Sequence, residues 1–253
     1  MRILVTNDDG IESVGIHVLA KALSQKHEVV LVAPDGERSA CSQSLSSMYS
    51  VTYKEDSRFG FTAYSMSGTP ADCVKLATLH LMRQPPDLVV SGINNGMNLG
   101  TDVIYSGTVA AAFEGLYMGV RSIAVSTGYH ASEEKLEEVA AFVVDNLDKM
   151  LALDLPGTSA LNINYPAKQP VKGVKITGLG DHRYFDGFVP HGEGHRLTGT
   201  PQPLPEDGRD CDIHWFGEGY VTLTPVQNDR NDYVTLKRIK GEFVGANNVR
   251  PHN

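Results

Sequence analysis

Two adjacent carboxylates, Asp8 and Asp9, are the residues of this 253-residue sequence whose types and spacing point most directly to chemistry. They lie in the segment NDDG at residues 7–10, directly after the apolar run Arg2–Thr6. Neighbouring carboxylates repel each other unless a cation lies beside them. Because oxygen ligands suit hard cations such as Mg²⁺, Mn²⁺ and Ca²⁺, the pair predicts a metal site. An ordinary turn or helix cap is the alternative interpretation.

Further oxygen donors follow two other apolar runs. Ser39 ends the segment DGERS at residues 35–39, and Asn94 lies in the Gly- and Asn-rich segment at residues 92–100. If the apolar runs are parallel strands, these segments lie at the same edge of one sheet. Ser39 and Asn94 could then join the carboxylate pair as ligands, although Asn95 offers the same amide oxygen as Asn94.

A hydroxyl-Gly-hydroxyl triplet, Ser106-Gly107-Thr108, opens the Ala-rich helical pattern Thr108–Met118. The start of a helix offers free N–H groups and the positive end of the helix dipole, and both favour a phosphate group. An ordinary N-cap at Thr108 is the alternative. The triplet lies only a few residues beyond the Asn-rich segment, which favours both roles together.

The elements that would position these residues follow an alternating pattern. Strands are predicted at Arg2–Thr6, Glu28–Ala33, Asp87–Ser91 and Ser122–Ser126, and strand-like segments follow at Val174–Thr177 and Tyr220–Thr224. Helical patterns separate and follow these strands, the longest at Glu133–Leu151. Thr69, Pro70 and Asp72 form the start signal of one of the helices. Continuous apolar strands joined by helices indicate a parallel sheet covered on both faces. The predicted fold class is therefore α/β, a doubly wound, Rossmann-like, mainly parallel sheet.

The pattern changes in the last third of the chain. We predict a Rossmann-like catalytic core over residues 1–177 and an extended β-hairpin arm over residues 178–219, where Gly, Pro and charge are frequent. Residues 220–253 would return a final strand to the core and end in an oligomerisation segment, all within one domain. The aromatic residues of the arm need a surface to cover, which predicts subunit contacts for Phe185, Phe188 and Trp215. Its histidines, predicted to be exposed loop residues, are His182, His191 and His195.

Composition excludes several classes of function. A net charge of −8 argues against nucleic acid or an anionic membrane surface as the main partner. The three cysteines have no CxxC spacing, so neither a disulfide framework nor a zinc site is indicated. No apolar run reaches the roughly 18 residues of a membrane span, and the chain starts directly with a strand-like segment, which predicts a cytoplasmic protein. Walker, GxGxxG, HExxH and GxSxG motifs are absent from the sequence.

Several longer motifs resemble those of the SurE family, the stationary-phase survival protein E phosphatases. The motifs are RILVTNDDG, VAPDGERSACSQS, SGTPADCVKLA, PDLVVSGINNGMNLGTDVIYSGTVAAAFEGL, LNINYP and EGYVTLTPV, which cover nearly the whole chain up to Val226. The resemblance implies a metal-dependent nucleoside monophosphate phosphatase, a 5′-nucleotidase. It also implies activity on 3′-nucleotides and short polyphosphate, and a swapped C-terminal arm that forms homodimers or homotetramers.

The same resemblance implies the roles of individual residues. The ligands of one divalent cation per subunit, Mg²⁺ or Mn²⁺, would be Asp8, Asp9, Ser39 and Asn94. The phosphate group would be bound by Asn98, Ser106, Gly107 and Thr108. Asp8 and Asp9 are also the catalytic candidates, because one of them would orient or deprotonate the attacking water. The tail, residues 241–253, departs from the regular helix of the family.

Two alternatives remain at this point. A non-hydrolytic, metal-dependent nucleotide- or phosphate-binding regulatory protein is the alternative class of function. Within the enzyme class, direct hydrolysis is favoured over a phosphoaspartyl intermediate, because the cation requires both carboxylates and no Lys is placed by motif as a counter-charge. The sequence does not distinguish among bases, between 5′ and 3′ phosphates, or among metals.

Overall fold

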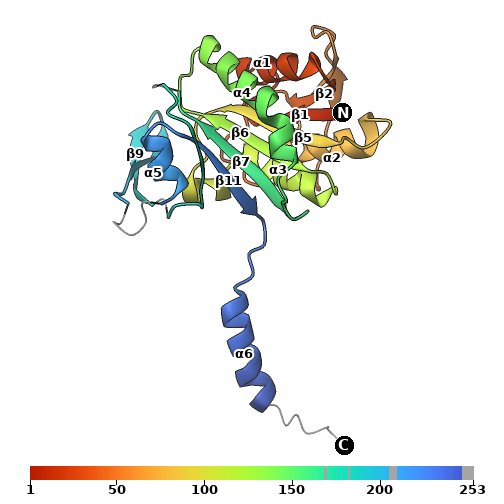
Figure 1. The fold of residues 1–253 in the computed structure, drawn as a ribbon. Helices are drawn as coiled ribbons and strands as arrows, with labels where there is room; N and C mark the ends of the chain where they lie inside the picture. Colours follow the sequence, from red (N-terminus) through yellow and green to blue (C-terminus); the bar gives the residue numbers. More distant parts are fainter. Residues whose placement is uncertain (168–169, 182, 205–209, 247–253) are drawn as a thin grey trace, which may run out of the picture.

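The computed structural model describes residues 1–167, 170–181, 183–204 and 210–246. Its main feature is a nine-stranded sheet in the order β3-β4-β2-β1-β5-β6-β7-β11-β8 (Figure 1). The strands are β1 (Arg2–Thr6), β2 (Glu28–Pro34), β3 (Tyr53–Glu55), β4 (Thr62–Met66), β5 (Leu88–Asn95), β6 (Ser122–Thr127), β7 (Ser159–Tyr165), β8 (Val174–Ile176) and β11 (Val221–Gln227). Only the β3–β4 and β7–β11 pairs of this sheet are antiparallel. The predicted α/β fold with a mainly parallel sheet is confirmed.

Helices cover both faces of the sheet (Figure 1). One face is covered by α1 (Val14–Ser24) and α4 (Glu133–Leu151), and the other by α2 (Pro70–Leu76) and α3 (Gly107–Tyr117). Successive side chains of a strand point to opposite faces. Accordingly, Ile3 and Val5 of β1 pack in the apolar cluster beneath α1 and α4, whereas Leu4 packs beneath α2 and α3. Burial on both faces explains why the sequence of this strand is continuously apolar.

Strand order reverses at β1. From β1 the sheet continues through β2 to β4 on one side, and the chain then returns to place β5 on the other side of β1. Ligands of open parallel sheets bind beyond the carboxyl ends of the strands at such a point. The segments that follow β1 and end β5 therefore lie where a ligand site is expected.

Local sequence signals predicted several helix boundaries correctly. The Thr69 hydroxyl accepts a hydrogen bond from the Asp72 amide, and the Asp72 carboxylate accepts one from the Thr69 amide, so the predicted capping box is confirmed. Helix α2 then continues as a π-helical turn, Ala77–Leu81. The predicted helix Glu133–Leu151 is also confirmed, as α4.

Strand β5 is longer than predicted. We expected it to end at Ser91, but it continues to Asn95, with a shift in its pairing with β6 between Ser91 and Asn94. Gly92 makes this possible, because its φ of 137° is a conformation that other residues avoid. A Cβ atom at Gly92 would also lie 2.2 Å from the Val125 carbonyl oxygen. The irregular strand end is the element that presents both asparagines to the site.

Three strands were not predicted from the sequence, namely β3, β4 and β7. Strand β7 contains two asparagines, Asn162 and Asn164, and both are completely buried. Polar side chains in a buried strand break the apolar pattern by which such strands are recognised. Their burial is explained by the hydrogen bonds that both side chains make with the backbone of Asn98.

The predicted arm is a hairpin in only part of its length. Strands β9 (Tyr184–His191) and β10 (Gly194–Pro201) form a separate antiparallel pair, which carries exposed Phe185 and Phe188. The expectation of an arm up to residue 219 is wrong, because Asp212–Gly217 forms helix α5, which packs beside β11. Within α5, Trp215 lies against Tyr220, so it covers the molecule's own surface.

His191 and His195 are exposed as predicted, but they lie on strands β9 and β10 and not in loops. His182 lies outside the described residues.

Helix α6 (Tyr233–Ala246) extends away from the sheet (Figure 1). The tail prediction is thus wrong for residues 241–246, which are helical, and residues 247–253 lie outside the described part. None of the helices in the described ranges is long and apolar enough to cross a membrane.

Candidate active site

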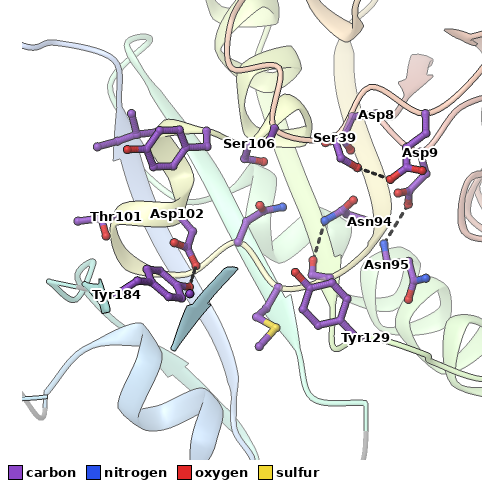
Figure 2. A pocket seen from close by; sticks show the side chains of 18 of the residues that line it. Asp8, Asp9, Ser39, Asn94, Asn95, Thr101, Asp102, Ser106, Tyr129 and Tyr184 are labelled. Carbon is purple, nitrogen blue, oxygen red and sulfur yellow. Dashed lines mark hydrogen bonds between the residues drawn. The ribbon is translucent and has the colours of Figure 1, made fainter. Parts of the chain in front are cut away.

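A cavity of about 1430 Å³ lies beyond the carboxyl ends of β1 and β5 (Figure 2). The wall on the sheet side includes all four predicted cation ligands, Asp8, Asp9, Ser39 and Asn94, together with Asn98 and Ser106. The opposite wall is the β9–β10 hairpin, including Tyr184 and Thr198. Residues from distant parts of the sequence therefore meet at the switch point of the sheet, as the strand-end pattern predicted.

Asp8 is the most deeply buried carboxylate of this wall, with 3% of its surface exposed. The Thr108 hydroxyl donates a hydrogen bond to Asp8 Oδ1 at 2.5 Å. Burial raises the pKa of Asp8 to about 6, and the adjacent Asp9 charge adds to this rise, whereas the Thr108 hydrogen bond opposes it. The ionised form of Asp8 is thus poorly compensated by the protein alone.

Asp9 has a similar environment but is less buried. The backbone amide of Asn95 donates to Asp9 Oδ2 at 3.0 Å. Burial raises the pKa of Asp9, and the charge of Glu37 raises it further against the effect of the Asn95 amide. Two neighbouring carboxylates that are both costly to ionise fit a site for a cation, because a cation removes this cost.

Ser39 lies on an exposed turn after β2. Its hydroxyl donates to Glu37 Oε1 at 2.8 Å, and the amide of the preceding residue, Arg38, donates to the Asp8 carbonyl oxygen at 2.7 Å. The turn is thereby attached to the segment that carries the carboxylate pair. Glu37 also lines the cavity, and it was not among the predicted site residues. Its acidic type within the DGERS segment was the signal that could have found it.

The two asparagines at the end of β5 differ in their contacts. Asn94 Nδ2 donates to the Gly96 carbonyl oxygen at 2.6 Å, and Asn94 Oδ1 makes no hydrogen bond with the described residues. Asn95 Oδ1 instead accepts from the His130 amide at 3.0 Å. The oxygen of Asn94 is therefore free to bind a ligand, whereas that of Asn95 is already used, which favours Asn94 as the cation ligand.

Neutral oxygens have to complete any cation site here. In the parts of the chain that the structure describes, no group of three His, Cys, Asp or Glu side chains lies close enough together to hold a metal ion. The donors that remain beside the two carboxylates are a hydroxyl and an amide. This oxygen-only set matches the preference of Mg²⁺ and Mn²⁺ rather than that of Zn²⁺.

Asn98 is held rigidly from β6 and β7. Its amide donates to Asn164 Oδ1 at 2.8 Å, and its carbonyl oxygen accepts from Asn162 Nδ2 and Asn164 Nδ2. Its own side-chain amide donates to Ser126 Oγ at 2.8 Å. The two buried asparagines of β7 thus fix the backbone of Asn98 at the cavity wall. Sequence reasoning missed them because their role depends on this long-range contact.

The start of α3 differs from the prediction in one respect. Ser106, not Thr108, is the N-cap, and its hydroxyl accepts from the Val109 amide at 3.1 Å. Thr108 lies within the first turn and is completely buried against Asp8. A Cβ atom at Gly107 would lie 2.8 Å from Asp8 Cβ. The absence of a side chain at Gly107 therefore allows the helix start to lie directly against the carboxylate.

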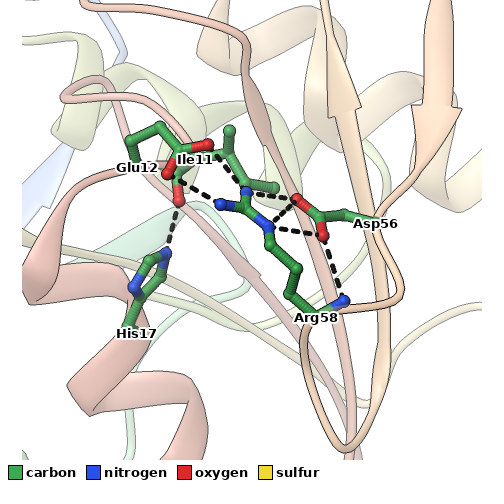
Figure 3. Close-up of polar contacts among 5 residues, drawn as sticks. All are labelled: Ile11, Glu12, His17, Asp56 and Arg58. Atoms are coloured by element: carbon green, nitrogen blue, oxygen red, sulfur yellow. Dashed lines mark hydrogen bonds and ion pairs between the residues drawn. The ribbon is translucent and has the colours of Figure 1, made fainter.

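Two further contacts shape the surroundings of the site. Tyr184 of the hairpin donates its hydroxyl proton to Asp102 Oδ2 at 2.7 Å, which fastens the hairpin to the 3₁₀ turn Gly100–Ile104 (Figure 2). On the outer side, Arg58 forms ion pairs with Glu12 and Asp56 (Figure 3). These ion pairs connect the segment after the carboxylate pair to the turn between β3 and β4.

Comparison with known proteins agrees with the sequence resemblance. Residues 3–186 match the family model described as Survival protein SurE. A protein of Pelotomaculum thermopropionicum named 5′-nucleotidase SurE is 41% identical over 247 residues, covering 95% of this chain and 94% of that protein. One of the same name from Vibrio cholerae is 40% identical over 244 residues, covering 94% and 95%. The crystal structure of the SurE protein from Aquifex aeolicus matches with a TM-score of 0.79 and 35% identity, covering 96% of this chain and 100% of that one. The chain therefore belongs to the Survival protein SurE family.

Proposed function

We propose that this chain is a metal-dependent 5′-nucleotidase, which hydrolyses nucleoside monophosphates to nucleoside and phosphate. The observation that carries the proposal is the contact between Asp8 and the first turn of α3. It brings an oxygen-rich site for a cation next to a helix start suited to phosphate. The full-length relatives from Pelotomaculum thermopropionicum and Vibrio cholerae, both named 5′-nucleotidase SurE, support the same activity.

The residues that would hold one Mg²⁺ or Mn²⁺ per subunit are Asp8, Asp9, Ser39 and Asn94. When bound, such a cation supplies Lewis acidity that polarises a phosphoryl oxygen and lowers the pKa of a coordinated water. Asp9 keeps one carboxylate oxygen fixed by the Asn95 amide. The Thr108 hydroxyl likewise holds one carboxylate oxygen of Asp8, so both carboxylates have defined orientations before substrate binds.

The phosphate group of the substrate would be bound by Asn98, Ser106, Gly107 and Thr108. Thr108 would contribute its backbone amide, because its hydroxyl is already donated to Asp8. The Ser106 hydroxyl accepts from the Val109 amide, which leaves its proton for a phosphate oxygen. Amide groups and the dipole at the start of α3 stabilise negative charge on the equatorial oxygens of an in-line displacement. Asp8 or Asp9 orients the attacking water and accepts its proton, and Asp8 is the one in direct contact with the phosphate-binding turn.

We extend the proposal to 3′-nucleotides and short polyphosphate. A cavity of about 1430 Å³ leaves room for more than a phosphate group, and exposed Tyr105 and Tyr129 line it as surfaces for a base or sugar. We also propose a homodimer or homotetramer. The exposed apolar residues of the β9–β10 hairpin and of α6 would be covered by another copy of the chain, namely Phe185, Phe188, Val234, Leu236 and Ile239.

A panel assay tests the proposal. Phosphate release is measured with excess 5′-AMP, 3′-AMP, other nucleoside monophosphates and tripolyphosphate, in the presence of Mg²⁺, Mn²⁺ or a chelator. We expect many turnovers of 5′-nucleotides with either cation and none with the chelator. Binding of nucleotide without release of phosphate would contradict the enzyme and identify the non-hydrolytic regulatory protein instead.

A further inference from the structure

An ion pair lies behind the turn that carries Ser39. Glu114 of α3 has a side chain that is only 3% exposed, and Lys75 of α2 contacts Glu114 Oε1 at 2.7 Å. A carboxylate this deeply buried requires its partners, because removing one leaves an uncompensated charge. The Glu114 side chain is therefore a fixed point in this region of the molecule.

Gln43 connects this fixed point to the C-terminal segment. Gln43 Nε2 donates to Glu114 Oε2 at 2.9 Å. Gln43 Oε1 accepts from Asn228 Nδ2 at 2.6 Å. Both ends of the Gln43 amide are thus occupied, which determines its orientation. Gln43 lies four residues after Ser39, and Asn228 lies directly after β11, between this strand and α6.

The turn between Ser39 and Gln43 has an unfavourable backbone. Ala40 and Ser42 adopt φ angles of 56° and 52°, a region that residues other than Gly rarely occupy. Such conformations persist only where the surroundings enforce them. Ser42 supplies part of this enforcement, through hydrogen bonds from its amide to the Tyr105 carbonyl oxygen and from its hydroxyl to that of Ile104. Gln43 supplies the next contact along the chain.

A second cavity, of about 310 Å³, adjoins this contact. Gln43 and Asn228 both line it, as do Ser106 and Phe113 of the α3 region. Since empty space borders the amide of Gln43, no packed side chain is available there to replace its hydrogen bonds. Loss of the Gln43–Asn228 contact would therefore let the turn relax toward the cavity.

We propose that Gln43 is a positioning residue for Ser39, held by Glu114 on one side and Asn228 on the other. Through Asn228, the foot of the C-terminal segment is linked to the turn that completes the cation site. The inference rests on the proposed function only in assigning Ser39 to that site. It adds two residues, Gln43 and Asn228, that touch neither cation nor substrate but set the cation affinity.

The test measures the Mn²⁺ dissociation constant of wild type, Gln43→Ala and Asn228→Ala by calorimetry on chelated, full-length protein. Loss of residues that orient metal ligands weakens metal binding about 10- to 100-fold. We expect this range for Gln43→Ala and a smaller change in the same direction for Asn228→Ala. Gln227→Ala is the matched control, because its amide donates to Ser159 of β7 and not to the turn. It should bind Mn²⁺ like wild type.

An exchange of groups provides a rescue. Gln43→Glu alone places a second carboxylate against Glu114 and should weaken Mn²⁺ binding. The double variant Gln43→Glu/Glu114→Gln exchanges donor and acceptor, so it retains the hydrogen bond and should recover most of the lost affinity. If Gln43→Ala does not fold, Gln43→Met takes its place, because it keeps the volume and removes both hydrogen bonds.

Kinetics separate positioning from general destabilisation. With Gln43→Ala, the Mn²⁺ concentration for half-maximal phosphate release should rise as the dissociation constant does, whereas kcat at saturating Mn²⁺ should stay within about threefold of wild type. A lower Tm with unchanged Mn²⁺ affinity would overturn the inference and leave the proposed function intact. A wild type that neither binds Mn²⁺ nor releases phosphate would overturn the proposed function itself.

Discussion

Asp8 combines three constraints in one side chain: burial, an adjacent carboxylate and a hydrogen bond from Thr108. The first two disfavour its ionised form and raise its pKa to about 6, although the Thr108 hydroxyl and backbone hydrogen bonds from Asp8 and Thr108 oppose this rise. Its neighbour Asp9 is also disfavoured as an anion. The protein has therefore placed two carboxylates where they are costly without a cation, which is the arrangement expected of a binding site rather than of a turn.

Replacing either carboxylate should separate activity from stability. For Asp8→Asn and Asp9→Asn we expect kcat to fall on the order of 10²-fold or more, because each removes charge from the proposed cation site. Both variants should remain folded by circular dichroism, since the substitutions relieve repulsion in the metal-free protein. Near-normal kcat in both variants would show that residues 7–10 form only an ordinary turn.

The raised pKa of Asp8 predicts a pH-dependent stability in the metal-free protein. A folded pKa of about 6 against an ordinary value of 3.8 means that the folded protein binds the Asp8 proton more tightly than the unfolded chain does. The stability that depends on this proton is complete below pH 4 and is lost as pH rises through 6. The loss at pH 7.5 is at most about 3 kcal/mol, at 1.36 kcal/mol per pKa unit. Urea unfolding of chelated Asp8→Asn should therefore show it gaining stability relative to wild type between pH 4 and pH 7.5.

Asp56 provides a contrast of opposite sign. The hydrogen bond from Arg58 lowers the pKa of Asp56 to about 2, as the contacts in Figure 3 illustrate. Its contribution is therefore present above pH 4 and lost as pH falls through 2. Asp56→Asn should lose stability relative to wild type at pH 7.5, and this loss should become smaller as pH falls to 2. For Asp8, a stability difference between Asp8→Asn and wild type that is the same at pH 4 and pH 7.5 would show that burial does not raise the pKa of Asp8.

Most candidate site residues could be recognised individually. Asp8, Asp9, Ser39, Asn94, Asn98 and Ser106 follow strands or start a helix, and all of them line one cavity. Asn162 and Asn164 could not be recognised in this way, because they reach Asn98 across more than 60 residues of sequence. Their chemistry arises from pairing between strands, which a local pattern does not contain.

Among the elements, helix α3 shows both what local signals predict and where they stop. The Ser-Gly-Thr triplet correctly predicted a helix start, but the N-cap is Ser106, and the Thr108 hydroxyl donates its hydrogen bond to Asp8 instead. A hydroxyl within the first turn and one at the cap are alike in sequence. The position of the end of β1, which the sheet determines, decides which hydroxyl caps the helix and which contacts Asp8.

Ser106→Gly separates the cap from the phosphate contact. Glycine is tolerated at an N-cap, so the free energy of unfolding should fall by only a few tenths of a kcal/mol. The lost hydroxyl contact to phosphate should lower kcat/KM by roughly tenfold to a hundredfold, since such charge-assisted bonds contribute about 1.5–3 kcal/mol. Inorganic phosphate should also inhibit the variant more weakly. Unchanged kcat/KM and phosphate inhibition would remove the Ser106 side chain from the phosphate site.

Apolar residues remain exposed on two projecting elements, the β9–β10 hairpin and α6. Phe185 and Phe188 are 65% and 70% exposed on the hairpin, and Val234 is 84% exposed on α6. The sequence indicated that this region needs a surface to cover, but it did not separate the hairpin from α5, whose N-cap Cys211 and first residue Asp212 are buried. Glycine and proline content alone does not distinguish an extended arm from a segment that folds back.

Deletion of the projecting elements should change the assembly. Wild type at about 10 µM should scatter light as a dimer or tetramer of the 27.4 kDa chain. Replacing residues 186–199 by a short Gly linker, or ending the chain at residue 232, should lower that mass because apolar contact area is lost. A monomeric wild type would rule out the proposed oligomer. An assembly unaffected by both deletions would place the subunit contact elsewhere.

We expect one hard cation, held at the Asp8–Asp9 pair, to be required for phosphate release. Titration of chelated protein with Mn²⁺, followed in parallel by calorimetry and by phosphate release from 5′-AMP, tests this claim. We predict that both signals saturate together at one cation per chain and that Asp9→Asn loses both. Full turnover in the chelated protein before any Mn²⁺ is added would contradict the claim.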